Sequence, residues 1–382
     1  MLAYACSAVR PQYARRRILR MGLGLAVATA TTRPWQPGRL RAQDMPPPPA
    51  GVVPGGQVPP PMPPNAQMQA ILDQLAALGS LPLATVTPRQ GRELPSIFDA
   101  VRIVTAQHGL PAVEPVGGIE HRIIPGGPGS DGTLIRIYAP VKGGGPFPVL
   151  LYFHHGGFVV GTIDDNDASA RALVNAAGAI VISVGYRLAP EFPFPAAPED
   201  ALAAYAWALA NVGALGGDER RIAVGGESAG GTLAAVVCLM ARDRGLPLPA
   251  HQLLIYPASD FVNGANTPSA IQYADAKPLS RATILWFARY YLTSAADASN
   301  PYASPVYGAL AGMPPATVIT AEIDPRRDTG RLHAEALSAA GVPVVYRKYD
   351  GVTHLFFGAA AVLDEARQAV ALAADGVRGA IR

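Results

Sequence analysis

One serine of the sequence is enclosed by glycines. Residues 225–231 read Gly-Gly-Glu-Ser-Ala-Gly-Gly, with Ser228 at the centre. Glycines at both second neighbours match the pattern G-x-S-x-G, in which a strand ends in a sharp turn, a serine is exposed at its apex, and a helix begins. Such a serine is a candidate nucleophile. A glycine-rich loop that holds a serine by chance would match the pattern equally well, so the surrounding elements must decide between the two interpretations.

A base for this serine can be sought further along the chain. A serine hydroxyl is a poor nucleophile at neutral pH and needs an adjacent base, usually a histidine that a carboxylate orients. Where the serine lies in such a turn, the chain order is serine, acid, histidine. His251 opens a strand too soon after Ser228 for an acid to precede it, and His333 lies in a helical stretch. His354 follows the last expected strand, where a parallel sheet gathers its active site, and is the predicted base.

The acid of the expected trio is Asp324, because it ends the apolar run 316–324 and precedes His354. Asp328 opens the following helical stretch, where a carboxylate suits the helix dipole, and its expected role is a cap or a salt bridge. Asp350 is so close to His354 in sequence that it is not expected to reach the correct ring nitrogen. We therefore predict Asp324 as the partner of the histidine.

Donors for a developing oxyanion are expected after the apolar run 148–154. Residues 154–158 read His-His-Gly-Gly-Phe, and glycines allow backbone N–H groups to approach a substrate closely. The amides of Gly156 and Gly157 are the predicted donors, together with the amide of Ala229 directly after the candidate nucleophile.

The sequence shows no motif for a metal or a cofactor. His154 and His155 are adjacent, so in extended chain their side chains point to opposite sides, and no H-E-x-x-H pattern or Cys/His cluster accompanies them. The two cysteines are Cys6 and Cys238, and the second lies in an apolar helical run where a buried, unreactive thiol is expected. No metal and no cofactor is therefore predicted.

Strand-like and helix-like stretches alternate along the chain. The predicted strands cover 133–140, 148–154, 179–186, 221–226, 251–257, 316–324 and 342–351. Helices are predicted between most of them and at 66–78, 95–108, 281–293 and 364–377. This alternation predicts an α/β fold with a mostly parallel central sheet flanked by helices. Ser228 then falls where a strand is followed by a helix, which argues against a chance loop.

The charge of the chain is unevenly distributed. The formal net charge is +3, but residues 1–43 hold eight arginines and no acid, so the remainder is acidic on balance. Binding to nucleic acid is therefore not predicted. Three arginines at 15–17 precede a short apolar stretch at 21–32, which favours a twin-arginine signal over 1–43 and a periplasmic or secreted protein. An organelle transit peptide, or a cytoplasmic protein with a start codon placed too early, is the alternative.

Prolines mark the boundary between this leader and the folded part. Residues 44–64 are rich in proline and predict an extended linker without a core. The folded domain is expected over 65–382. The apolar stretch of the leader is too short to span a bilayer, so no stable membrane span is predicted.

With these residues placed, the chain resembles the hormone-sensitive-lipase-like branch of the α/β-hydrolases, also called bacterial esterase family IV. The resemblance covers roughly residues 65–375 and rests on six motifs in order: YFHHGGFVVG, SVGYRLAPEFPFPAAPEDALAAYAW, GGESAGG, SNPYASPVYG, AEIDPRRD and GVTHLFFG. It implies an α/β-hydrolase fold with a helical cap from about 65–110 and 262–295. It also implies a catalytic triad of Ser228, Asp324 and His354, with the oxyanion donors named above.

Two positions depart from the family pattern. His155 stands where the family usually has a glycine, and a histidine would be strained there if the position required a positive φ. Glu227 replaces the usual aspartate beside the nucleophile.

The resemblance implies a serine carboxylic-ester hydrolase that forms an acyl-enzyme on a small-molecule ester. Short- to medium-chain esters are expected, because aromatic residues of the implied cap should limit the cleft. The aromatic residues are Trp286, Phe287, Tyr290 and Tyr291, and the expected cap also contains the apolar residues Ile71, Leu72 and Leu75. The alternatives are a catalytically silent binding protein of the same fold, or a lactonase, amidase or true lipase, since the turn around Ser228 does not distinguish an ester from an amide.

Overall fold

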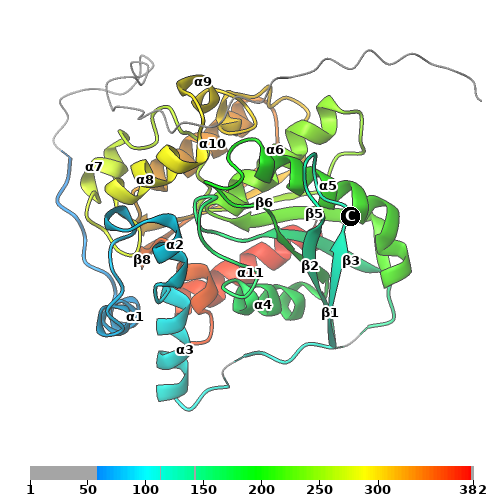
Figure 1. Ribbon diagram of the computed structural model, residues 1–382. Coiled ribbons are helices and arrows are strands. Elements are labelled where there is room, and N and C mark those ends of the chain that lie inside the picture. The colour runs from blue at the N-terminus through cyan, green and yellow to red at the C-terminus, as the bar shows by residue number, and fades with distance from the viewer. Residues whose placement is uncertain (1–57, 112, 142, 380–382) are drawn as a thin grey trace, which may run out of the picture. The chain divides into compact units, whose positions relative to one another are not determined.

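The computed structural model describes residues 58–111, 113–141 and 143–379. The expected signal over 1–43 and most of the linker over 44–64 lie outside these residues. The described chain contains an eight-stranded sheet in the order β1-β2-β4-β3-β5-β6-β7-β8 (Figure 1). β1 pairs with β2, and β2 with β4, in antiparallel fashion, and the other pairs are parallel. The predicted α/β fold with a mostly parallel sheet is confirmed.

The strands agree with the predicted runs to within a few residues, except for one that the sequence analysis missed. They are β1 (Gly118–Ile124), β2 (Thr133–Ala139), β3 (Phe147–Phe153), β4 (Ile180–Gly185), β5 (Gly217–Glu227), β6 (Gln252–Ile255), β7 (Ala316–Ile323) and β8 (Val344–Thr353). The missed strand is β1, which lies at the edge of the sheet. Only its last residue is buried, so it carries no apolar run or clean alternation that would mark it as a strand.

The helices follow the same pattern, with short ones added. They are α1 (Ala66–Ala77), α2 (Pro88–Glu93), α3 (Ile97–Gln107), α4 (Asp167–Ala177), α5 (Ala196–Asn211), α6 (Ala229–Asp243), α7 (Pro268–Gln272), α8 (Arg281–Tyr291), α9 (Ala295–Ala298), α10 (Arg327–Ala339) and α11 (Asp364–Gly379). The sequence analysis missed α2, α7 and α9, which are too short to show a helical period. No helix of the described chain is long and apolar enough to cross a bilayer.

β3 shows how the sheet is covered on both faces. Val149, Leu151 and Phe153 belong to one apolar cluster with residues of α5, α6, α8 and α10. Leu150 and Tyr152 belong to a second cluster with residues of α1, α3, α4 and α11. Successive side chains of a strand point to opposite faces, so a continuous apolar run is needed where both faces are covered. That requirement explains why this strand was recognisable from the sequence.

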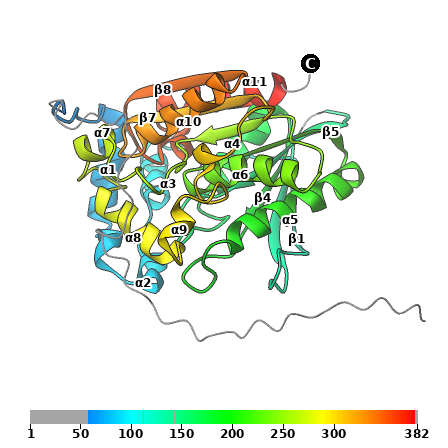
Figure 2. The same cartoon turned by 90° about the horizontal axis from the view of Figure 1, so that it is seen from above.

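The two segments expected to form a cap, 65–110 and 262–295, contact each other. Figures 1 and 2 show α2 beside α8. The indole Nε1 of Trp286 in α8 donates a hydrogen bond to the carbonyl oxygen of Val86, just before α2, at 3.0 Å. The N-terminal helices thus pack against the stretch that follows β6, although they are distant in sequence.

Cys238 lies in the centre of α6 and is fully buried. Its Sγ lies 3.3 Å from the carbonyl oxygen of Ala234, one turn earlier. Burial raises the pKa of the thiol, which keeps it protonated at neutral pH. The expected buried thiol is confirmed.

Two of the histidines considered as bases are enclosed elsewhere. His251 precedes β6, and its Nε2 lies 3.0 Å from the hydroxyl of Thr317. His333 lies in α10, and its Nδ1 lies 2.8 Å from the hydroxyl of Ser259. Burial lowers the pKa of each from 6.5 to about 4, so both are neutral at pH 7.

These depressed pKa values predict a loss of stability in acid. Below about pH 6.5 the unfolded chain binds a proton at each histidine that the folded chain does not bind until about pH 4, so stability falls across this window. The free energy of unfolding, measured in urea from pH 7.5 to 4.5, should fall less steeply in His251→Gln, by up to about 1.4 kcal/mol per pH unit. The exposed His108→Gln is the control for the exchange of a histidine for a glutamine. Equal slopes for His251→Gln and wild type would contradict the prediction.

Candidate active site

Ser228 occupies a strained turn between β5 and α6. Its backbone has φ 55° and ψ −115°, which an L-residue rarely adopts. A Cβ added at Gly226 would lie 2.5 Å from the carbonyl oxygen of Phe153, and one added at Gly230 would lie 1.9 Å from the same oxygen. Side chains at either position would collide with the end of β3, so the close approach of this strand requires both glycines.

The structure brings the three predicted residues together. The Oγ of Ser228 lies 2.9 Å from Nε2 of His354, and Nδ1 of His354 lies 2.7 Å from Oδ2 of Asp324. All three are buried, and Ser228 retains 8% of its surface. Asp324 follows β7 and His354 follows β8, so the side chains meet at the carboxyl ends of parallel strands.

This arrangement fixes the direction of each hydrogen bond. The carboxylate of Asp324 can only accept, so the proton of a neutral His354 lies on Nδ1. Nε2 then presents a lone pair to the hydroxyl of Ser228. The other oxygen of Asp324, Oδ1, accepts the amide of Arg326 at 2.7 Å, which holds the carboxylate in place. The arrangement can take a proton from the serine as its oxygen attacks an electrophile.

The competing acids lie away from His354. The carboxylate of Asp328 accepts the amide of Ser269 at 2.8 Å, and the hydroxyl of Ser269 accepts the amide of Asp328 at 3.1 Å. This reciprocal pair joins the start of α10 to α7. Asp350 is an exposed partner of Lys348, with 2.5 Å between Oδ1 and Nζ. Neither carboxylate has a hydrogen bond to a histidine.

The loop after β3 has the backbone that an oxyanion site needs. Gly156 has φ 114° and Gly157 has φ 59°, and an added Cβ at Gly157 would lie 2.2 Å from the ring of Phe287. Within the described residues neither glycine amide donates a hydrogen bond. Ala229 is the first residue of α6, where an amide has no intrahelical acceptor. His155 does not have a positive φ, so the strain considered for it does not arise.

Sequence reasoning missed the polar side chains around Glu227. This fully buried carboxylate, next to Ser228, accepts hydrogen bonds from Tyr152, Asn166 and Tyr256. Tyr256 also packs against the imidazole of His354, with 4.7 Å between ring centroids. The partners come from distant parts of the sequence and share no short motif, so no local signal could have identified them.

A second missed group is the guanidinium of Arg326, which is 3% exposed. It donates from Nη1 to the carbonyl oxygen of Asp260 at 3.1 Å and lies over the ring of Phe261, 5.6 Å from its centroid. Burial lowers its pKa to about 10, so it remains charged at neutral pH. A cation therefore lies two residues from Asp324.

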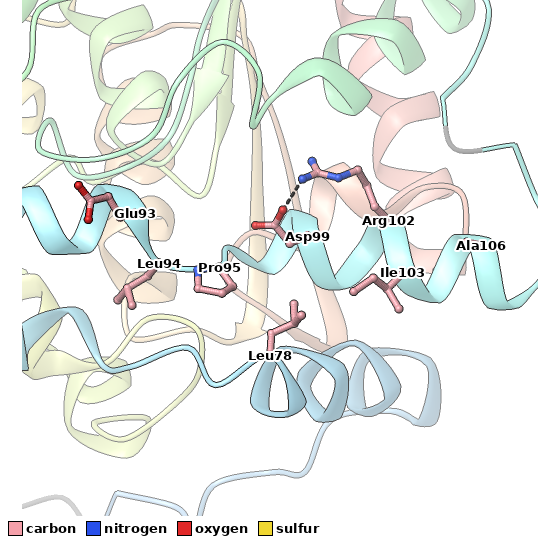
Figure 3. A pocket seen from close by; sticks show the side chains of 8 residues that line it. All are labelled: Leu78, Glu93, Leu94, Pro95, Asp99, Arg102, Ile103 and Ala106. Atoms are coloured by element: carbon pink, nitrogen blue, oxygen red, sulfur yellow. Dashed lines mark hydrogen bonds and ion pairs between the residues drawn. The ribbon is translucent and has the colours of Figure 1, made fainter.

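A groove elsewhere on the surface is not lined by Ser228, Asp324 or His354. It has a volume of about 530 Å³ and lies between the end of α1, the end of α2 and α3 (Figure 3). It is lined by Leu78, Glu93, Leu94, Pro95, Asp99, Arg102, Ile103 and Ala106. In the part of the chain that the structure describes, no group of three or more His, Cys, Asp or Glu residues could hold a metal ion.

The strained serine after β5, its histidine after β8 and the acid after β7 define the α/β-hydrolase class. Comparison with known proteins agrees. Residues 150–358 match the family model described as alpha/beta hydrolase fold. The chain is 45% identical to esterase LipI of Mycobacterium tuberculosis over 225 residues, which are 58% of this chain and 69% of LipI.

Two further relatives cover more of the chain. Carboxylesterase NlhH of Mycobacterium tuberculosis is 40% identical over 267 residues, which are 68% of this chain and 82% of NlhH. The structure of the esterase from the hyperthermophilic archaeon Pyrobaculum calidifontis superimposes with a TM-score of 0.75 at 40% identity, covering 83% of this chain and 99% of that one. The chain belongs to the α/β-hydrolase fold family, in its hormone-sensitive-lipase-like esterase branch, bacterial family IV. It is a carboxylesterase.

The geometry predicts which acid supports the histidine. Asp324→Asn should lower kcat by up to about 10⁴-fold, because an amide can misplace the proton of His354. Asp328→Asn should stay within about tenfold of wild type, since its amide oxygen can still accept the Ser269 amide. Hydrolysis of p-nitrophenyl butyrate by both variants, with thermal unfolding as a check on folding, makes the comparison. A larger loss in Asp328→Asn would show that the wrong acid was chosen.

Proposed function

We propose that the protein hydrolyses short- to medium-chain carboxylic esters through an acyl-enzyme on Ser228, without a metal or a cofactor. The observation that carries this proposal is the hydrogen-bonded series Ser228–His354–Asp324, with its contacts of 2.9 Å and 2.7 Å. It holds a nucleophile, a base and an orienting carboxylate in the order that covalent catalysis requires.

In the first half of the reaction Oγ of Ser228 attacks the carbonyl carbon, and Nε2 of His354 takes the hydroxyl proton. The carbonyl oxygen becomes an oxyanion, which accepts hydrogen bonds from the amides of Gly156, Gly157 and Ala229. As the tetrahedral intermediate collapses, the bond to the alcohol breaks, and the alcohol leaves with the proton from Nε2. An ester between the acyl group and Ser228 remains.

In the second half a water molecule attacks this acyl ester, and Nε2 of His354 again takes the proton. Collapse of the second intermediate returns the proton to Oγ of Ser228 and releases the carboxylic acid. The fully buried Asp324 acts in both halves, because its carboxylate stabilises the imidazolium that forms each time. Each oxyanion donor of this kind contributes about 10²- to 10³-fold to kcat.

Removal of the nucleophile should abolish this reaction. Ser228→Ala is expected to lose roughly 10³-fold or more of kcat, because the remaining groups cannot form the acyl-enzyme. A fluorophosphonate probe should label wild type at Ser228 and leave Ser228→Ala unlabelled. Incubation with EDTA should leave activity unchanged. Full activity in the variant, or loss of activity on chelation, would refute the mechanism.

The limit on acyl length is attributed to aromatic side chains of α8. The ring of Phe287 lies against Gly157, and the ring of Tyr291 stacks on Phe158 with 3.9 Å between centroids. These contacts place bulky groups directly beside the expected oxyanion loop. Each methylene buried in an apolar cleft contributes about 0.8 kcal/mol until the cleft is full, and longer chains then remain in water or clash.

This argument predicts a maximum in efficiency with chain length. Across p-nitrophenyl esters of two to sixteen carbons, kcat/KM should rise to about butyryl or hexanoyl and then fall. Phe287→Ala should move the maximum to longer chains by removing a ring beside Gly157, whereas Leu285→Ala, at a more exposed position of the same helix, should not. A maximum on long emulsified esters in wild type would contradict the ceiling.

We also propose that the protein is exported to the periplasm or beyond. Support comes from the arginines at 15–17 ahead of a short apolar stretch, and from the absence of acids over 1–43.

A further inference from the structure

A buried carboxylate connects the turn that holds Ser228 with the loop after β3. Glu227 precedes Ser228 and is fully buried. Its Oε1 accepts the hydroxyl of Tyr152 at 2.7 Å and Nδ2 of Asn166 at 2.5 Å, while Oε2 accepts the hydroxyl of Tyr256. Burial and the nearby carboxylate raise the pKa of both tyrosines well above 10, so both stay protonated and donate.

The carboxylate fixes the orientation of Asn166. Because a carboxylate can only accept, the amide of Asn166 must present Nδ2 to Glu227. Its Oδ1 then faces His155, 2.6 Å from the ring Nδ1 and 3.4 Å from the backbone nitrogen. An amide oxygen also only accepts, so Nδ1 of His155 carries a hydrogen. One asparagine side chain therefore holds both the ring and the backbone of His155.

His155 is the residue directly before the expected oxyanion donors. Asn166 holds it on one side, and the ring of Phe98 packs against it with 4.9 Å between centroids. Asn166 is itself fully buried, and its backbone carbonyl oxygen accepts a hydrogen bond of 2.9 Å from the backbone amide of Ala170 in α4. The start of the loop is thus tied through rigid elements to the residue that precedes Ser228.

We propose that His155 and Asn166 are positioning residues that set the amides of Gly156 and Gly157 against Ser228, with Glu227 as their common anchor. This inference rests on the proposed acyl-enzyme mechanism. His155 is one of the two departures from the family pattern, and Glu227 is the other. In this protein the two departures are joined by a single asparagine.

A positioning role and a merely structural role have different signatures. Oxyanion donors act mainly on the tetrahedral state, so their displacement lowers kcat and weakens binding of a transition-state mimic, with little effect on KM. Loss of an ordinary buried hydrogen bond lowers the melting temperature and leaves both kcat and the binding of the mimic unchanged. The changes in kcat and in binding of the mimic, compared with the changes in KM and in stability, therefore distinguish the two roles.

The test uses two variants of the full-length enzyme and a matched control. His155→Phe keeps a ring against Phe98 but removes the Nδ1–H donor, and Asn166→Leu removes the amide at similar volume. The control, Thr317→Val, removes the buried hydrogen bond to His251. For each protein, kcat and KM on p-nitrophenyl butyrate, Ki for a trifluoromethyl ketone and the melting temperature are measured.

We expect kcat to fall and Ki to rise together by about 10- to 100-fold in both variants, with KM within about threefold. The double variant should lose little more than the more damaged single variant, because both break one series of contacts. His155→Asn should recover most of kcat, since its Nδ2 can occupy the place of Nδ1. The control should melt earlier and keep kcat and Ki.

Unchanged kcat and Ki in folded His155→Phe would overturn the proposal, as would a change confined to KM or to the melting temperature. If Asn166→Leu fails to fold, His155→Phe decides alone, because it leaves all three donors to Glu227 in place. Failure of the mechanism itself is separate: it would appear as wild type that a fluorophosphonate does not label at Ser228.

Discussion

The site depends on the close approach between the end of β3 and the turn that holds Ser228. The carbonyl oxygen of Phe153 leaves no room for a Cβ at Gly226 or Gly230. This approach places the loop after β3, with Gly156 and Gly157, next to the start of α6. Ser228 follows β5, whereas Gly156 and Gly157, two of the three expected oxyanion donors, follow β3, so this packing is what brings them together.

The strain in the turn is sustained by ordinary secondary structure on both sides. A backbone conformation like that of Ser228 costs about 1–3 kcal/mol. Its amide donates to the carbonyl oxygen of Ile255 at 2.9 Å, and its own carbonyl oxygen accepts the amide of Thr232 at 3.0 Å. Two hydrogen bonds, one to β6 and one within α6, thus hold the residue in a conformation that presents Oγ to Nε2 of His354. The parallel sheet then supplies the acid and the histidine at the same edge, where β7 and β8 end.

Much of this could be predicted from sequence because the relevant signals are local. The apolar run of β3, the glycines around Ser228 and the position of Asp324 at the end of β7 can each be read within ten residues. The order of strands and helices then determines which strand ends lie next to one another in the sheet. The edge strand β1 escaped prediction because it buries almost nothing, and the short helices α2, α7 and α9 escaped because they complete too few turns to show a period.

The polar environment of the site was beyond sequence reasoning for a different reason. Glu227 and His155 each looked like an isolated departure from a pattern, and nothing in the sequence indicated that Asn166 contacts both. Hydrogen bonds have strict geometric requirements, so a buried carboxylate constrains its partners more tightly than an apolar neighbour would. One donor that faces Glu227 determines the orientation of the asparagine, and this in turn determines the tautomer of the histidine. Local sequence patterns therefore identify the candidate catalytic residues, whereas the residues that hold them in position can be recognised only in the folded structure.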